Sequence, residues 1–154
     1  MDKTLTFAPL DVDANRDFLF VAHRETSRLT FSTAFTDEQI ECELNRERGN
    51  STGAFLDGKI VGICDVERRE INGVDFGWVH FFYLTPELRG RGFGAQLVVC
   101  AEVFCRESKL DKLFLRVGEP NVGAYRFYER SGFEREPELD KAGEFGFMKN
   151  VNRE

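Results

Sequence analysis

A glycine-rich segment at residues 85–95 limits what this chain can fold into more than any other feature. It reads Thr-Pro-Glu-Leu-Arg-Gly-Arg-Gly-Phe-Gly-Ala and lies between an apolar run at 76–84 and a helical pattern at 93–108. A strand must therefore end and a helix begin within a few residues, and glycine allows both the tight turn and the close approach of a ligand.

The first turn of that helix offers free N–H groups beside the glycines. With the positive end of the helix dipole, these donors suit a pyrophosphate group, and two arginines add positive charge. The segment therefore predicts a phosphate-binding loop, for which a solvent-exposed turn between strand and helix is the alternative. The predicted loop comprises Arg89, Gly90, Arg91, Gly92, Phe93, Gly94 and Ala95.

Two common nucleotide-binding motifs compete for this loop. A Walker A loop is excluded because no Gly-Lys-Ser/Thr closes the segment. Gly90, Gly92 and Ala95 formally satisfy the dinucleotide fingerprint G-x-G-x-x-A. That fingerprint opens the first βαβ unit of a parallel sheet, whereas three strands that pattern as antiparallel come first here, so a Rossmann domain is disfavoured.

The N-terminal part of the chain predicts one strand and two helices. The strand is expected at 3–9, and the helices at 11–24 and 37–48. Between the helices, the stretch at 26–36 holds six Ser and Thr residues, which makes it too polar for a core element. We expect a connection there.

Three antiparallel strands follow in the sequence. Strands at 52–56 and 59–66 flank Asp-Gly at 57–58, a dipeptide that favours a two-residue hairpin because both positions need positive φ. A second turn is expected at Asn-Gly, residues 72–73, before the apolar strand at 76–84.

The C-terminal half adds a crossover from strand to helix to strand. The helix at 93–108 leads to a strand at 112–117, which such a connection makes a parallel neighbour of the preceding strand. A helix at 121–130 and strands at 132–136 and 144–150 complete the chain. The predicted fold class is α/β: a mixed, mostly antiparallel sheet with helices on both faces.

Length and composition exclude several classes of protein. A chain of 154 residues suits a single domain spanning 1–154, and its net charge of -6 with no long Lys/Arg run disfavours nucleic-acid binding. No stretch approaches about 18 apolar residues and no signal segment is evident, so we expect a cytoplasmic protein without a membrane span. Four cysteines and two histidines lack metal-ligand spacing, so no metal site is expected.

Three further segments accompany the glycine loop in a characteristic order. The apolar strand and Pro-containing turn at 82–87 precede the loop, whose Arg-x-x-Gly-x-Gly motif begins at Arg89. Asn-x-x-Ala-x-x-Phe-Tyr-Glu-x-x-Gly-Phe follows at 121–133, and Phe-Met-Lys at 147–149. Over residues 76–149 this pattern resembles the GNAT superfamily of acetyl-CoA-dependent N-acetyltransferases.

The resemblance implies how acetyl-CoA, the acetyl donor, would bind. Backbone groups of Phe82, Tyr83 and Leu84 would contact the pantetheine arm, where this strand splays from the strand at 112–117. The loop N–H groups would hold the pyrophosphate, and Asn121 would contact the same cosubstrate. Spacing alone also places Asn121, Tyr125 and Tyr128 on nearly one helix face.

The resemblance assigns the acid that protonates the departing CoA thiolate to Tyr128. A covalent route through Cys100 or Cys105 is disfavoured, because both occupy helix positions expected to face the core or its edge. The rival function is a non-catalytic acyl-CoA-binding or sensing domain, which the retained Tyr128 argues against.

The base that deprotonates the amine is less evident. An amine with a pKa near 10 is protonated at neutral pH and must lose a proton before it attacks. The resemblance implies a Glu on one of the two splayed strands, as in many members of the family, but this chain has Trp78 and Arg116 where that Glu is expected. His80 is the first candidate, because strand alternation puts it on one side with Trp78, Phe82 and Leu84. Glu119, Asp75, ordered water, and a purely structural His80 are the alternatives.

The amine acceptor, a small molecule or a protein, is not identified by the sequence. We expect it to bind at 26–36 and the loops beside 76–84 and 136–144. Phe31 and Phe35 would line that cleft, and the alternative is that they only pack the connection between the helices. Sheet edges or terminal strands would suit a homodimer.

Overall fold

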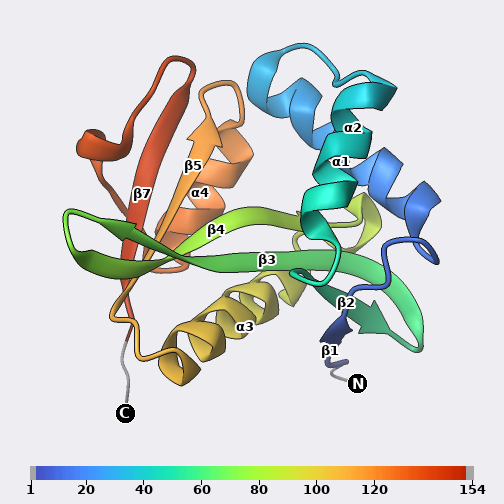
Figure 1. Cartoon of the computed structure of the whole chain (residues 1–154), viewed down its shortest axis with the longest axis horizontal. Helices are drawn as coiled ribbons and strands as arrows, with labels where there is room; N and C mark the ends of the chain where they lie inside the picture. Colours follow the sequence, from blue (N-terminus) through green and yellow to red (C-terminus); the bar gives the residue numbers. More distant parts are fainter. Residues whose placement is uncertain (1–2, 152–154) are drawn as a thin grey trace.

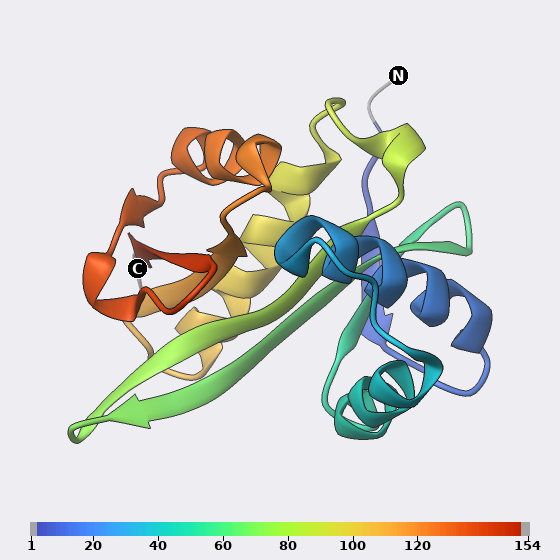
Figure 2. The same ribbon diagram turned by 90° about the horizontal axis from the view of Figure 1, so that it is seen from above.

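The computed structural model describes residues 3–151, which form a seven-stranded sheet with helices on both faces (Figures 1 and 2). The strand order is β1-β2-β3-β4-β5-β7-β6. The strands are β1 (Thr6–Pro9), β2 (Thr52–Leu56), β3 (Lys59–Ile71), β4 (Val74–Leu84), β5 (Lys112–Gly118), β6 (Glu134–Arg135) and β7 (Glu144–Asn150). The α/β class predicted from the sequence is confirmed.

Four α-helices and two short 3-10 segments connect the strands in the described part of the chain. The helices are α1 (Arg16–Phe31), α2 (Asp37–Glu47), α3 (Phe93–Glu107) and α4 (Val122–Arg130), and the 3-10 segments are η1 (Pro86–Leu88) and η2 (Pro137–Leu139). Figure 2 shows α1 and α2 on one side of the sheet and α3 and α4 on the other. No helix within residues 3–151 combines the length and the apolar character that a membrane crossing requires.

The strands β4 and β5 are parallel neighbours that separate after a short contact. Only Gly77 with Leu113 and Trp78 with Phe114 are paired between them. Beyond these residues the two strands diverge, as Figure 1 shows. The other strand pairs are antiparallel. The splayed parallel pair implied by the family resemblance is therefore present.

Both predicted hairpin turns are confirmed. Asp57 and Gly58 have φ values of 52° and 79°, and Asn72 and Gly73 have 53° and 80°. Positive φ at both central positions is the geometry that matches the twist of two flanking strands. The strands β3 and β4 extend further toward the second turn than their apolar pattern indicated, because their ends form an exposed ribbon.

The predicted bounds of the first helix are wrong. Residues 11–15 form a turn in which the Asp11 carboxylate accepts the N–H of Ala14 at 3.1 Å, and α1 runs on to Phe31. The polar residues at its C-terminal end find partners within α1 and in the segment that follows it. The Ser27 hydroxyl, for example, donates to the Arg24 carbonyl at 3.0 Å and accepts from Phe35 N–H at 2.8 Å.

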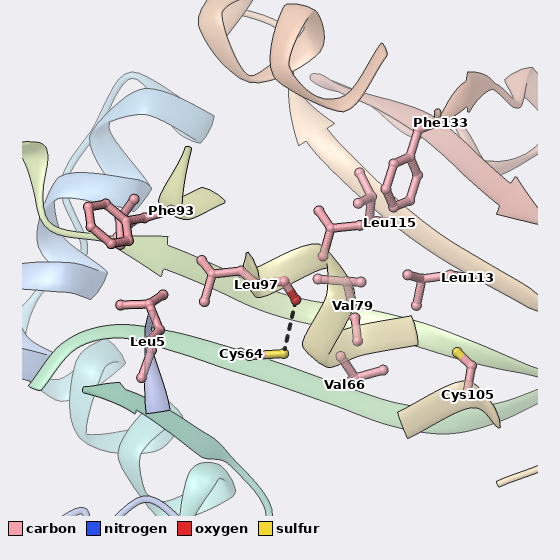
Figure 3. Packing of buried hydrophobic residues seen from close by; sticks show 14 of the residues in the cluster. Leu5, Cys64, Val66, Val79, Phe93, Leu97, Cys105, Leu113, Leu115 and Phe133 are labelled. Atoms are coloured by element: carbon pink, nitrogen blue, oxygen red, sulfur yellow. Dashed lines mark hydrogen bonds between the residues drawn. The ribbon is translucent and has the colours of Figure 1, made fainter. Parts of the chain in front are cut away.

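Two apolar clusters hold the helices on the sheet. In the first, Leu97 and Cys105 of α3 pack against sheet residues such as Val79, as Figure 3 shows. In the second, Leu19 of α1 and Leu44 of α2 pack against the opposite face. Burial of an apolar stripe thus holds α1, α2 and α3 on the sheet.

A β-bulge interrupts β4 at His80. Val66 of β3 pairs with Val79, whereas Asp65 pairs with Phe81, so His80 has no partner in the β3 register. Before the bulge Val79 faces α3, and after it Phe81 faces α1 and α2. The extra residue therefore shifts the alternation of β4 by one position.

The bulge overturns the predicted face of His80. Phe82 and Leu84 pack with the α3 cluster, whereas the His80 ring lies 3.6 Å from Glu43 of α2. The prediction that His80 shares a face with these two residues is wrong, because strict alternation does not continue through a bulge. Its shared face with Trp78 holds, since both border the cavity on the α1 and α2 side.

Candidate active site

Two cavities open where β4 and β5 splay apart. The loop cavity, of about 720 Å³, follows the glycine loop and the N-terminus of α3. The cleft cavity, of about 380 Å³, lies among α1, β4, β5 and the segment before β7. Both are lined by Thr26, Phe82, Asn121, Ala124 and Tyr128, so they meet at these residues.

The glycine loop presents open backbone to the loop cavity. Gly90 and Gly92 have φ values of 73° and 90°, and a Cβ atom at either position would meet nothing within 4 Å. Gly92 is also the N-cap of α3 and provides no side chain to bond the N–H groups of its first turn. These donors and the helix dipole fit an anionic group, as a pyrophosphate would require.

Arg89 joins the end of β4 to α1. Its Nε atom donates to the Leu84 carbonyl at 2.9 Å, and its guanidinium pairs with Glu25. The Tyr83 hydroxyl donates to the same carboxylate at 3.0 Å, and burial together with this bond raises the pKa of Tyr83 to about 12. These contacts fix the loop that begins at Arg89.

The structure places most of the predicted loop and strand residues on the loop cavity. Phe93 is buried in the core beneath the loop, and the Arg91 guanidinium lies 5.7 Å from its ring centroid. Neither residue lines the cavity. The predicted residues that line it are Phe82, Tyr83, Leu84, Arg89, Gly90, Gly92, Gly94, Ala95, Asn121 and Tyr128.

Tyr128 projects from α4 to the junction of the two cavities. Its ring lies 6.3 Å from that of Phe82 and 5.3 Å from that of Phe133, centroid to centroid. These apolar surroundings raise the pKa of the Tyr128 phenol above its ordinary value, mainly through burial. The phenol therefore keeps its proton at neutral pH and is available as a donor.

Asn121 and Tyr125 take different positions from the ones that helical spacing indicated. Asn121 precedes α4 as its N-cap, where its side chain accepts the N–H of Ala124 at 3.3 Å. Tyr125 turns toward β7, where its ring lies 5.5 Å from that of Phe145 and its hydroxyl donates to the Gly118 carbonyl. The predicted shared face therefore holds for Asn121 and Tyr128 but is wrong for Tyr125.

His80 lies between two carboxylates in the cleft cavity. Its Nε2 atom is 3.6 Å from Glu43 Oε2, and its Nδ1 atom is 3.8 Å from Glu67 Oε1. The contact with His80, with the charge of Arg46 3.2 Å away, lowers the pKa of Glu43 to about 2. Glu43 is therefore ionised at neutral pH and faces the ring of His80.

Comparisons with known proteins show the family to which the chain belongs. The profile of the acetyltransferase (GNAT) family matches residues 16–133. An uncharacterized N-acetyltransferase of Methanocaldococcus jannaschii is 34% identical, over 98% of this chain and 68% of that protein. The chain belongs to the GNAT family. It is an acetyl-CoA-dependent N-acetyltransferase.

The chain is also similar to one more distant relative in sequence and to a solved structure in fold. A spermine/spermidine N(1)-acetyltransferase of Bacillus subtilis is 25% identical, over 86% of this chain and 88% of that protein. The structure of the PaiA N-acetyltransferase of Thermoplasma acidophilum, in complex with coenzyme A, superimposes with a TM-score of 0.68 at 22% identity. That match covers 96% of this chain and 99% of the other.

The two less favoured base candidates of this acetyltransferase are not part of either cavity wall. Asp75 pairs with Arg68 at 2.7 Å in the exposed ribbon of β3 and β4. Neither Asp75 nor Glu119 lines the loop cavity or the cleft cavity. Their residue types suited a base, but the sequence did not reveal that neither residue lines a cavity.

The cysteines on α3 are also separate from the site. Cys105 is fully buried, and burial raises the pKa of its thiol to about 11, so the thiol stays protonated. Neither Cys100 nor Cys105 lines either cavity.

Sequence reasoning missed Glu43 and Glu144, which both line the cleft cavity. Glu43 stands on the same helix side as Ile40 and Leu44, whose side chains are fully buried. An acidic residue beside two core positions was a usable signal. Glu144 begins β7 and offered no comparable signal.

Proposed function

We propose that acetyl-CoA occupies the loop cavity and that a primary amine reaches it through the cleft cavity. The observation that carries this proposal is the junction of the two cavities at Tyr128, Asn121 and Phe82. A donor and an acceptor that enter from opposite sides of the sheet would meet there without a covalent enzyme intermediate. Proximity of this kind supplies much of the rate in a direct transfer.

In this proposal the open backbone of the glycine loop holds the pyrophosphate. The first-turn N–H groups of α3 donate to it. Because β4 diverges from β5 beyond Trp78, the edge of residues 82–84 that faces away from β3 has no strand partner, and the pantetheine arm binds along that edge. Asn121, at the mouth of both cavities, contacts the same molecule.

Tyr128 and His80 take the acid and base roles in the transfer. The amine nitrogen bonds to the thioester carbonyl carbon, and the bond from that carbon to sulfur breaks. The Tyr128 phenol gives its proton to the sulfur, while the proton of the amine passes to His80, which the ionised Glu43 stabilises as a cation. A proton returned from His80 to Tyr128 through solvent restores the site.

The proposal is tested with a panel of amines. Thiol release from acetyl-CoA is measured with spermidine, the substrate class in the names of two Bacillus relatives, with amino acids, and with peptide N-termini. We expect turnover with at least one class and an acetylated product detected by mass spectrometry. Absence of product from every amine, in protein that binds acetyl-CoA, would contradict the proposal.

The same assay tests His80. We expect the substitution His80→Gln to lower kcat by about tenfold to hundredfold, because the variant side chain cannot take a proton from the amine. A kcat equal to that of the parent would contradict the base role of His80 and would assign deprotonation of the amine to water.

A further inference from the structure

Three residues form a row across the floor of the cleft cavity. Arg69 of β3, Trp78 of β4 and Arg116 of β5 lie on adjacent strands and on the same face of the sheet. The Trp78 ring lies between the two guanidinium groups, 4.6 Å from Arg69 Cζ and 5.0 Å from Arg116 Cζ. The floor of the cleft cavity is therefore a cationic and aromatic surface.

Most charged side chains that line this cavity have a partner of opposite charge. Arg69 pairs with Glu67 at 2.8 Å, and Lys141 pairs with Glu144 at 3.2 Å. Glu43, the remaining acid, pairs with Arg46 at 3.2 Å and faces His80. These pairs leave little net charge in the parts of the wall that they occupy.

Arg116 is the exception. Its Nε atom donates to the Leu139 carbonyl at 2.6 Å, and no carboxylate in the described residues 3–151 forms an ion pair with it. The side chain is half-buried. A guanidinium that is withdrawn from water without an anion is unfavourable, and an anionic ligand would remove that cost.

The geometry of Arg116 also suits an anion. The bond from Nε to Leu139 and the stacking over Trp78 fix the plane of the guanidinium, while its two terminal nitrogens form no hydrogen bond within residues 3–151. Two parallel N–H donors on a fixed plane match the two oxygens of a carboxylate.

We propose that the amine acceptor of this enzyme also carries a carboxylate, which Arg116 binds in the cleft cavity while the amine lies at the junction near Tyr128. This inference rests on the proposed acetyl transfer and assigns its substrate class. A polyamine does not fit this substrate class, because it carries only ammonium groups and has no anion that Arg116 could bind.

The test compares amino acids with their primary amides, which differ in the carboxylate. Thiol release from acetyl-CoA gives kcat/KM for each pair with the parent, Arg116→Gln and Arg116→Lys. Lys112→Gln is the matched control, because Lys112 is an exposed cation on the same strand and face as Arg116 but outside the cavity. The amine of an amino-acid amide is less basic than the amine of the amino acid, so a larger fraction of it is neutral and able to attack. Amine basicity alone would therefore favour the amide, and a preference for the amino acid must come from its carboxylate.

We expect the parent and Lys112→Gln to prefer the carboxylate member of the best pair by about tenfold or more, and Arg116→Gln to bring that ratio close to one. Arg116→Lys should retain part of the preference, since it keeps the charge but loses the planar pair of donors. Equal use of both members by the parent, or a ratio that Arg116→Gln leaves unchanged, would overturn the inference while acetyl transfer itself stands.

A binding measurement keeps the two questions separate. Calorimetric titration of the CoA-bound protein with the same amino acids needs no turnover. Binding that Arg116→Gln weakens about tenfold supports the carboxylate site even if no acceptor is acetylated. Binding that is equal in the parent and in Arg116→Gln overturns it.

Discussion

The contact between β5 and α1 gives a prediction whose size follows from atomic positions. Gly118 ends β5 directly against the last turn of α1. A Cβ atom at this position would lie 2.4 Å from Thr30 Cα and 2.7 Å from Thr30 O. Both are backbone atoms, so no side-chain rotation can relieve the overlap, and α1 must move away from the sheet.

We expect Gly118→Ala to lower the free energy of unfolding by about 3 kcal/mol, the upper part of the range for overpacked sites. For a chain of this size that loss lowers Tm by about 6 to 12 °C. Because α1 borders both cavities through Thr26, acetyl transfer should fall as well.

Urea unfolding followed by circular dichroism measures the change, with Gly123→Ala as control. A Cβ atom at Gly123 would meet nothing within 4 Å, and this glycine lies in α4, so alanine should change stability by about 1 kcal/mol or less in the favourable direction. If the free energy of unfolding of Gly118→Ala lies within about 1 kcal/mol of the parent value, the close packing of β5 on α1 is refuted.

Two further predictions concern Glu43 in the cleft cavity and Gly92 in the glycine loop. The pKa of Glu43 is lowered from 4.5 to about 2 in the folded state. The ionised Glu43 carboxylate therefore stabilises the folded state above pH 4.5, and this contribution is lost as the pH falls toward 2. Because 28% of the Glu43 side chain is exposed, solvent screens part of this effect, and we expect Glu43→Gln to lower the free energy of unfolding by about 2 kcal/mol at pH 7. Between pH 4.5 and 2, the free energy of unfolding of the variant should depend less steeply on pH than that of the parent. An equal dependence in the two proteins would contradict this prediction. Gly92 has a φ of 90°, so Gly92→Ala should lower the free energy of unfolding by about 1 kcal/mol. The same substitution should weaken acetyl-CoA binding severalfold, as measured by calorimetry, and unchanged binding would argue against the loop as the phosphate site.

Local chemistry explains which parts of the fold were predictable. The turns at 57–58 and 72–73 and the N-terminus of α3 depend on glycine and its neighbours, so the sequence showed them directly. The continuation of α1 to Phe31 depends instead on space beside β5 and on the bonds of Ser27. No property of residues 26–31 alone indicated that tertiary context.

The site divides in the same way. The loop residues and Tyr128 were found because they lie in contiguous motifs, and the structure places Tyr128 and Asn121 at one junction. The face of His80 was wrong because a bulge leaves no mark in a pattern of apolar residues. Glu43 reaches the same cavity from α2. Its position beside the buried Ile40 and Leu44 was a signal in the sequence, but its contact with His80 on a distant strand was not.

The measurement that tests the account most directly is steady-state acetyl transfer by the Tyr128→Phe variant. The substitution removes one hydroxyl and keeps the ring that packs on Phe82 and Phe133. We predict that kcat falls by about a hundredfold, while the Kd of acetyl-CoA stays within about twofold of the parent value. A kcat within about threefold of the parent would contradict proton donation by Tyr128 at the junction of the two cavities.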